Sequence, residues 1–209
     1  CVYSVSGRCK GLSLMSLAAN KPLHLPDTEY TQKEKDDAFA QTLGTERVYL
    51  LDHFGSRDID NIVNNVRYFA KAAGCEYLFV DHISIIVSAQ AHGDERKALD
   101  EIMTRFRMIV QETGISLILV SHLKRPENKG HEEGAATSLA QLRGSGSIAQ
   151  LSDMVLGLER NGQADDIQER NTTRVRVLKN RFSGVTGPAC SLLYSMSTGR
   201  MVEIDEEDI

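Results

Sequence analysis

The sequence predicts an α/β fold whose mostly parallel sheet is extended by an antiparallel edge. Short apolar runs alternate with amphipathic helical stretches as far as about residue 159, which is the pattern of parallel strands joined by crossover helices. Beyond that point two strand-like runs, 173–179 and 189–194, follow one another without a helix between them. Consecutive strands of this kind pair as a hairpin, so the sheet should end in antiparallel strands.

Apolar spacing, caps and helix breakers define the expected elements. Thr31, with Glu34 three residues later, has the pattern of a capping box and begins a polar helix. Gly74 and Gly114 follow two longer amphipathic stretches and end them. In chain order the expected elements are strand 2–5, helix 10–19, loop 20–31, helix 31–43, strand 47–51, helix 58–73, strand 77–80, loop 88–93, helix 94–113, strand 116–120, polar segment 124–137, helix 138–142, helix 147–152, strand 154–159, polar insert 161–171, and strands 173–179 and 189–194.

Composition is that of an ordinary globular protein. The 209 residues are 41% hydrophobic and 25% charged, and we expect one domain over 1–209 with an acidic tail over 199–209. The net charge of −5 argues against a histone-like basic binder, although cations can still gather on one face. No apolar run approaches the roughly 18 residues of a membrane span, so we expect no membrane partner. The four cysteines lack metal spacing, which indicates reduced thiols and a cytoplasmic protein.

Two apolar runs end in polar residues that suit a Mg²⁺–nucleotide site. One run ends at Asp81, and the other leads through Ser121 to His122. In a parallel sheet both would emerge at the carboxyl ends of neighbouring strands, where such sheets bind ligands. Asp81 could hold metal-bound water, and His122 could sense a terminal phosphate. Each residue alone also fits a structural role, Asp81 as a cap and His122 as a satisfied strand-end histidine.

The polar segment 124–137 is a candidate DNA contact. Lys124, Arg125 and Lys129 could meet the phosphates of a strand. The same segment carries glutamates at 127, 132 and 133, so a plain solvated loop is an equal alternative.

Two further cationic motifs follow. Arg143 precedes a Gly-Ser-Gly turn that begins at Gly144, where backbone N–H groups can approach a phosphate, or where a helical turn simply breaks. Lys179 and Arg181 end a strand on the same side, an arrangement suited to reaching a neighbouring subunit's nucleotide. An exposed basic strand end is the alternative.

Taken in order, these motifs resemble the helicase domain of hexameric replicative helicases with a RecA-type core. The resemblance runs from about Leu12 to Met201, is strongest for the bifunctional primase–helicases of short-tailed phages, and extends more distantly to DnaB-type and Twinkle-type helicases. The strings that carry it are Asp81-His-Ile-Ser-Ile85, Asp94-Glu-Arg-Lys97, Ser121-His-Leu-Lys124, His131-Glu-Glu-Gly134, the run 142–153, Gly157-Leu-Glu-Arg-Asn161 and Leu178-Lys-Asn-Arg-Phe-Ser-Gly184. It implies a RecA-like P-loop NTPase fold.

The resemblance also implies residue roles. Asp81 would be the Walker B carboxylate acting through Mg²⁺, and His122 the phosphate-sensing switch. Lys124 and Lys129 would lie in a loop that faces a central channel, and the motif that links DNA contact to the nucleotide would contain Arg143, Gly144 and Gln150. Lys179 and Arg181 would reach the γ-phosphate of the neighbouring subunit's nucleotide. Tyr194 would pack against the nucleotide base.

The chain departs from this family pattern in two places. No Gly-Lys-Ser/Thr occurs in it, and in the family that phosphate-binding loop precedes the position of Cys1. The family's catalytic glutamate aligns with Ser4. We therefore expect an amino-terminally truncated fragment that does not hydrolyse nucleotide at a useful rate by itself.

The expected function is that of the C-terminal part of a ring helicase. Such a protein would use ATP or dTTP with Mg²⁺, form a hexamer or heptamer, translocate on single-stranded DNA, and act beside a primase domain and a replicative DNA polymerase. It would work in a bacterial or phage-infected cell rather than in a mitochondrion. The alternatives are a catalytically inactive assembly or DNA-binding subunit, and a RecA-type recombinase or clock-type ATPase.

Overall fold

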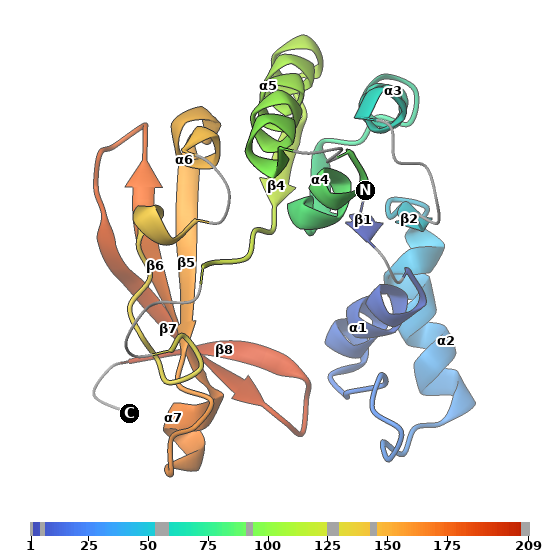
Figure 1. Cartoon of the computed structure of the whole chain (residues 1–209). Helices are drawn as coiled ribbons and strands as arrows, with labels where there is room; N and C mark the ends of the chain where they lie inside the picture. The colour runs from blue at the N-terminus through green and yellow to red at the C-terminus, as the bar shows by residue number, and fades with distance from the viewer. Residues whose placement is uncertain are drawn as a thin grey trace. The chain divides into compact units, whose positions relative to one another are not determined.

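The computed structural model describes residues 2–4, 7–52, 59–90, 94–124, 130–142 and 146–205. These residues fall into two compact units, Cys1–His122 and Leu123–Ile209 (Figure 1). No helix within the described ranges has the length and apolar character that a membrane crossing requires.

The described strands of the first unit form a four-stranded parallel sheet in the order β2-β1-β3-β4. The strands are β1 Val2–Ser4, β2 Leu50–Asp52, β3 Tyr77–Asp81 and β4 Ser116–Leu119, and the helices are α1 Gly7–Ala19, α2 Gln32–Gln41, α3 Ile59–Lys71, α4 Ile83–Gln90 and α5 Glu95–Thr113, with a 3₁₀ turn η1 at Leu43–Thr45. β3 alternates between exposed and buried residues, and its Leu78 and Val80 are buried. The long helices α3 and α5 pack together and supply most of the other buried apolar side chains.

Helix ends in this unit follow the local rules that the sequence displays. Glu34 accepts the backbone N–H of Thr31 at 2.8 Å and its own N–H donates to Thr31 Oγ1 at 3.2 Å, so the capping box of α2 is confirmed. Asp94 caps α5, and Gly114 ends it with a φ of 74°. A glycine is favoured there because other residues adopt positive φ at a cost.

The described strands of the second unit form a four-stranded antiparallel sheet in the order β5-β6-β7-β8. Its strands are β5 Met154–Arg160, β6 Thr172–Asn180, β7 Gly187–Ser195 and β8 Arg200–Ile204, and its short helices are α6 Ser147–Leu151 and α7 Ile167–Asn171, with a 3₁₀ turn η2 at Leu139–Gln141. Figure 1 shows these strands side by side as a meander.

The expected fold class is confirmed, with a parallel sheet followed by antiparallel strands. Several details differ. The strand at 154–159, expected in the alternating part, pairs antiparallel with β6, and residues 200–204 of the expected acidic tail form β8. Helices α4 and α7 were not expected, and the helix expected over 138–142 is a 3₁₀ turn. One domain over 1–209 stays a prediction.

Candidate functional site

The carboxyl ends of the parallel strands share one edge of the sheet. Ser4 stands in register with Asp52 on one side and with Asp81 on the other. Beyond the end of β4, the N–H of Val120 donates to the carbonyl of Val80 at 2.9 Å, and the carbonyl of Val120 accepts from the N–H of Ile83 at 3.0 Å. The chain therefore reaches Ser121 and His122 beside the end of β3, at the edge where parallel sheets bind ligands.

His82, the residue after Asp81, contacts His122 at this edge. The rings of His82 and His122 lie 4.3 Å apart between centroids and are inclined by 64°. His82 follows Asp81 directly, and its Nδ1 is buried with no hydrogen-bond partner among the described residues. Burial lowers the pKa of His82, and the charge of His122 lowers it further, whereas Asp81 opposes the shift. Neutral imidazole is thus favoured for the ring between the two predicted site residues.

A Mg²⁺ ion fits the donor chemistry of this edge. Among the described residues no cluster of three His, Cys, Asp or Glu side chains stands ready to hold a metal. Mg²⁺ commonly takes one or two protein carboxylates and completes its shell with water and substrate phosphates, so it does not need such a cage. Asp81, half-buried at the end of β3, can supply the one carboxylate.

Lys179 lies at the C-terminal end of α6. Its Nζ donates to the carbonyl oxygens of Ala149 at 2.6 Å, Gln150 at 3.2 Å and Ser152 at 2.8 Å. These are carbonyls that a helix end leaves without partners in the helix, and a cation there also suits the helix dipole. The ammonium group has three N–H donors, and the three contacts match them.

Arg181 lies beside the same helix end. Its Nη1 donates to Asp153 Oδ1 at 3.0 Å, and its Nη2 donates to the carbonyl of Gln150 at 3.1 Å. The backbone N–H of Arg181 also donates to the carbonyl of Asp153 at 2.9 Å. Sequence reasoning paired Arg181 with a neighbouring subunit and did not find Asp153, which lies in a different motif.

Lys124, the first residue of the predicted DNA segment, has backbone contacts within the second unit. The N–H of Lys124 donates to the carbonyl of Gln141 at 2.7 Å, and the carbonyl of Lys124 lies 3.2 Å from His131 Nε2. Leu123 and Leu142 form an antiparallel bridge next to these contacts. Of the predicted DNA-contacting residues, Lys124 makes these contacts, whereas Arg125, Lys129, Arg143 and Gly144 lie outside the described residues.

A buried carboxylate in the family-like string Gly157–Asn161 binds two residues outside that string, and sequence reasoning gave it no role. Glu159 of β5 is 7% exposed, and its Oε1 accepts from Thr137 N at 2.7 Å, Thr137 Oγ1 at 2.9 Å and Arg176 Nε at 2.7 Å. Burial raises the pKa of Glu159, but the hydrogen bonds from Arg176 and Thr137 outweigh it and leave the pKa below its ordinary value. A charged residue at an inward position of an alternating strand was the available signal.

Two remaining predicted residues lie in the second unit. Gln150 is exposed on α6, and its carbonyl accepts from Arg181 and Lys179 as described above. Tyr194 is half-buried on β7 and stands in register with Met201 of β8. Their predicted roles toward a nucleotide stay predictions.

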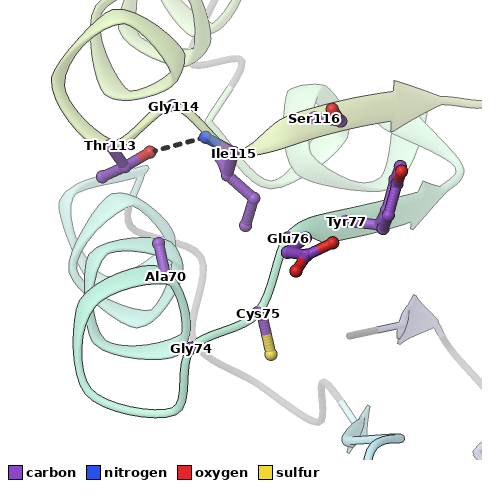
Figure 2. Close-up of a pocket in the computed structure, with 9 residues that line it drawn as sticks. All are labelled: Ala70, Gly74, Cys75, Glu76, Tyr77, Thr113, Gly114, Ile115 and Ser116. Atoms are coloured by element: carbon purple, nitrogen blue, oxygen red, sulfur yellow. Dashed lines mark hydrogen bonds between the residues drawn. The ribbon is translucent and has the colours of Figure 1, made fainter.

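A pocket of about 420 Å³ lies at the opposite edge of the parallel sheet from Asp81 and His122. Figure 2 shows it between the last turns of α3 and α5 and the beginnings of β3 and β4. Its lining includes Cys75, Glu76 and Ser116, and the N–H of Ile115 donates to Thr113 Oγ1 at 3.4 Å across its rim. Asp81 and His122 follow the carboxyl ends of the strands and do not line this pocket.

Comparisons with known proteins identify the family of the chain. A family model for the DnaB-like helicase C-terminal domain matches residues 15–202. A DNA helicase/primase of Enterobacteria phage T3 is 41% identical over 165 residues, which are 78% of this chain and 29% of the relative. A probable plasmid replicative DNA helicase of Chlamydia psittaci is 26% identical over 146 residues, which are 69% of this chain and 31% of the relative.

Solved structures show the same fold. A DnaB-like replicative helicase, whose structure was described together with its interactions with primase, superimposes with a TM-score of 0.75 at 17% identity and covers 98% of this chain and 51% of its own. The protein therefore has the RecA-like fold of replicative helicases. The chain belongs to the family of DnaB-like helicase C-terminal domains. It spans less than a third of the length of either curated relative.

Proposed function

We propose that this chain is the motor part of a replicative ring helicase that hydrolyses ATP or dTTP with Mg²⁺ and moves along single-stranded DNA. The observation that carries the proposal is that Asp81 and His122 both follow the carboxyl ends of neighbouring parallel strands in a member of this helicase family. Two strand ends that hold a carboxylate and an imidazole form a site for a metal–phosphate ligand.

The chemistry assigned to these residues is positioning and charge neutralisation. Asp81 would hold a Mg²⁺ ion, and the ion would supply positive charge at the phosphates of the nucleotide. His122 contacts the γ-phosphate and so distinguishes triphosphate from diphosphate. Arg181 of one subunit neutralises charge at the nucleotide of its neighbour, and such a finger raises the rate by about 10³–10⁵-fold. Tyr194 packs against the base.

The partners follow from the family and its relatives. We propose a ring of six or seven copies, because an arginine finger completes a site only across a subunit boundary. A relative is named as a helicase/primase, and a solved relative was described with primase, which supports a primase domain or protein as a partner here. The predicted replicative DNA polymerase contact belongs to the same proposal. The relatives belong to a phage and a bacterium, which supports the cytoplasm of a bacterial or phage-infected cell.

The chain by itself should not hydrolyse nucleotide. It contains no Gly-Lys-Ser/Thr, and the residue aligned with the catalytic glutamate is Ser4, which stands in register beside Asp81. A serine hydroxyl is not a general base at neutral pH. Turnover therefore requires a phosphate-binding loop that these 209 residues do not contain. An inactive assembly subunit is the second candidate, and Ser4 is the observation that favours it.

Phosphate release from dTTP and ATP tests both candidates. The assay compares the full-length protein that contains this chain with its Asp81→Asn and Arg181→Ala variants, in the presence of single-stranded DNA. The motor assignment predicts turnover that falls by at least about 100-fold in either variant, while an exposed Glu203→Gln control keeps the rate. A full-length protein that binds single-stranded DNA and shows no turnover would support the inactive subunit instead.

DNA binding is tested separately by fluorescence anisotropy with a labelled oligonucleotide. Replacing Lys124, Arg125 and Lys129 by alanine together should weaken binding and reduce the salt slope by about 2, since each lost phosphate contact on a single strand removes roughly 0.7. Unchanged affinity and unchanged salt slope would show that this segment is a solvated loop.

A further inference from the structure

We infer that Asp153 positions Arg181, the proposed finger. Lys179 stabilises the C-terminal end of α6, beside which Asp153 and Arg181 lie. The inference rests on the proposed function of Arg181 and names the residue through which its guanidinium is placed. Asp153 follows Ser152, the C-cap residue of α6, and Arg181 follows the end of β6.

The guanidinium is fixed by contacts of two kinds. Asp153 Oδ1 accepts from Nη1 at 3.0 Å, and the carbonyl of Gln150 accepts from Nη2 at 3.1 Å. The backbone of Arg181 is bound to the backbone of Asp153 as well, at 2.9 Å. The backbone contact fixes the position of the Arg181 main chain, and the two side-chain contacts fix the guanidinium group. Together they restrict the orientation of the guanidinium group.

The donor count distinguishes the two cations. The three N–H donors of Lys179 match three carbonyls of α6, so a phosphate contact would cost it one of these bonds. Arg181 carries five N–H donors and uses two of them within the described residues. Among the described residues three of its donors have no acceptor, so Arg181 can bind an incoming phosphate while both of these contacts stay intact, and it suits the anion better than Lys179 does.

The charge of Asp153 does not disable the finger. The Arg181 side chain is 47% exposed and the Asp153 side chain 35% exposed, so solvent screens the pair and the contact is one of orientation more than of strong attraction. An orientation error of about 1 Å at a reacting group can cost about 100-fold in rate. Asp153 is thus a positioning residue that acts through Arg181 and touches no substrate.

A double-mutant cycle on dTTP hydrolysis tests this in the full-length protein that contains the chain. Asp153→Ala should lower kcat by about 10–100-fold with little change in KM, because it displaces a transition-state contact. In an Arg181→Ala background the same change should have less than about a twofold effect. Asp153→Asn keeps an acceptor oxygen and should recover much of the rate. Asp205→Ala, an exposed aspartate of the same unit, is the matched control.

The outcomes separate the two claims. If Arg181→Ala lowers kcat and Asp153→Ala lowers it by the same factor with and without Arg181, Asp153 acts independently and the inference is wrong. If Arg181→Ala leaves kcat unchanged, the proposed finger itself is wrong and the inference falls with it. A readout without hydrolysis is the NMR order parameter of the Arg181 Nε–H group in the chain, which should be high in the parent and lower in Asp153→Ala. Equal order parameters in both proteins would also overturn the inference.

Discussion

Replacing Glu159 by alanine should destabilise the antiparallel unit by about 3 kcal/mol. Its carboxylate is 7% exposed and accepts from Thr137 twice and from Arg176. Alanine would leave the N–H and the hydroxyl of Thr137, itself 5% exposed, buried without these acceptors. Breaking a buried charge pair costs about 3–5 kcal/mol. The Arg176 side chain keeps 31% of its surface in solvent and can be rehydrated, so the lower end of that range applies.

Urea unfolding followed by far-ultraviolet circular dichroism measures this loss. With a slope of about 1–3 kcal/mol per molar urea, a loss of about 3 kcal/mol moves the midpoint down by about 1–3 M. Hydrogen exchange of peptides from β5 and β6 locates the effect, because both strands supply the residues of the contact. Glu159→Gln keeps one acceptor oxygen but turns an amide donor toward Arg176, so its loss should be smaller than that of the alanine variant.

The matched control is Glu203→Gln on β8, where the glutamate is exposed. That change should alter the free energy of unfolding by no more than about 0.5 kcal/mol. A Glu159→Ala variant that unfolds at the same urea concentration as the control, with unchanged exchange in β5 and β6, would refute the assigned role of the buried carboxylate.

Three further predictions concern single contacts. Gly157→Ala should cost about 1–3 kcal/mol, because the new Cβ would lie 1.9 Å from Thr137 Oγ1, and urea unfolding measures the loss. Thr31→Ala should lower the local stability of α2 by about 1 kcal/mol, read from hydrogen exchange of that helix. Hydrogen bonds from Arg67 and then Lys71 lower the pKa of Glu112 to about 2, so its stabilising effect is complete above pH 4.5 and is lost as pH falls toward 2. Glu112→Gln should therefore be less stable than the parent near neutral pH and equal to it in strong acid, in unfolding curves taken across that range.

Each of these predictions has a control and a contrary result. Gly162→Ala adds a Cβ with its nearest neighbour at 3.8 Å and should be tolerated; equal losses in the two glycine variants would refute the steric explanation. Thr198→Ala is the control for the α2 cap, and unchanged exchange in α2 after Thr31→Ala would refute the cap. Glu203→Gln is the control for acid unfolding. A stability gap between parent and Glu112→Gln that persists in strong acid would contradict the charge explanation.

Local features of the fold were predictable because the interacting groups are close in sequence. The capping box of α2 joins residues three apart, and the ends of β3 and β4 follow from apolar runs that stop at a polar residue. Neighbouring parallel strands then bring Asp81 and His122 to one edge, as predicted from strand direction alone.

Elements without a distinct period were missed. Helix α4 lies over a short, almost wholly apolar run, in which helix and strand look alike. Helix α7 lies in a polar insert, yet it carried a signal: Asp166 accepts from the N–H of Glu169 at 2.8 Å, the same cap logic as in α2. β8 was hidden by the acidic residues around it.

Contacts between distant positions could not be read from the chain. Glu159 meets Thr137, and Asp153 meets Arg181, only after the strands and α6 have packed. Local sequence patterns predict at which sheet edge or on which face of an element a charged residue lies. The residue that its side chain contacts depends on how the strands are paired in register. Lys179 illustrates this: its spacing to Arg181 did not indicate that its ammonium donates to the carbonyls of Ala149 and Ser152, and its predicted role at a neighbouring nucleotide stays a prediction.

β1 is an interior strand of the described parallel sheet, between β2 and β3. Val2 stands opposite Leu50 on one side and Phe79 on the other, so in the described sheet β2 connects to β3 and β4 through three residues. During synthesis this strand leaves the ribosome long before its partner β3 exists, and pairing across such a separation is slow. A proline in place of Tyr3, in the middle of this central strand, should therefore remove a donor of the strand ladder and weaken the pairing of β2 with the rest of the described sheet.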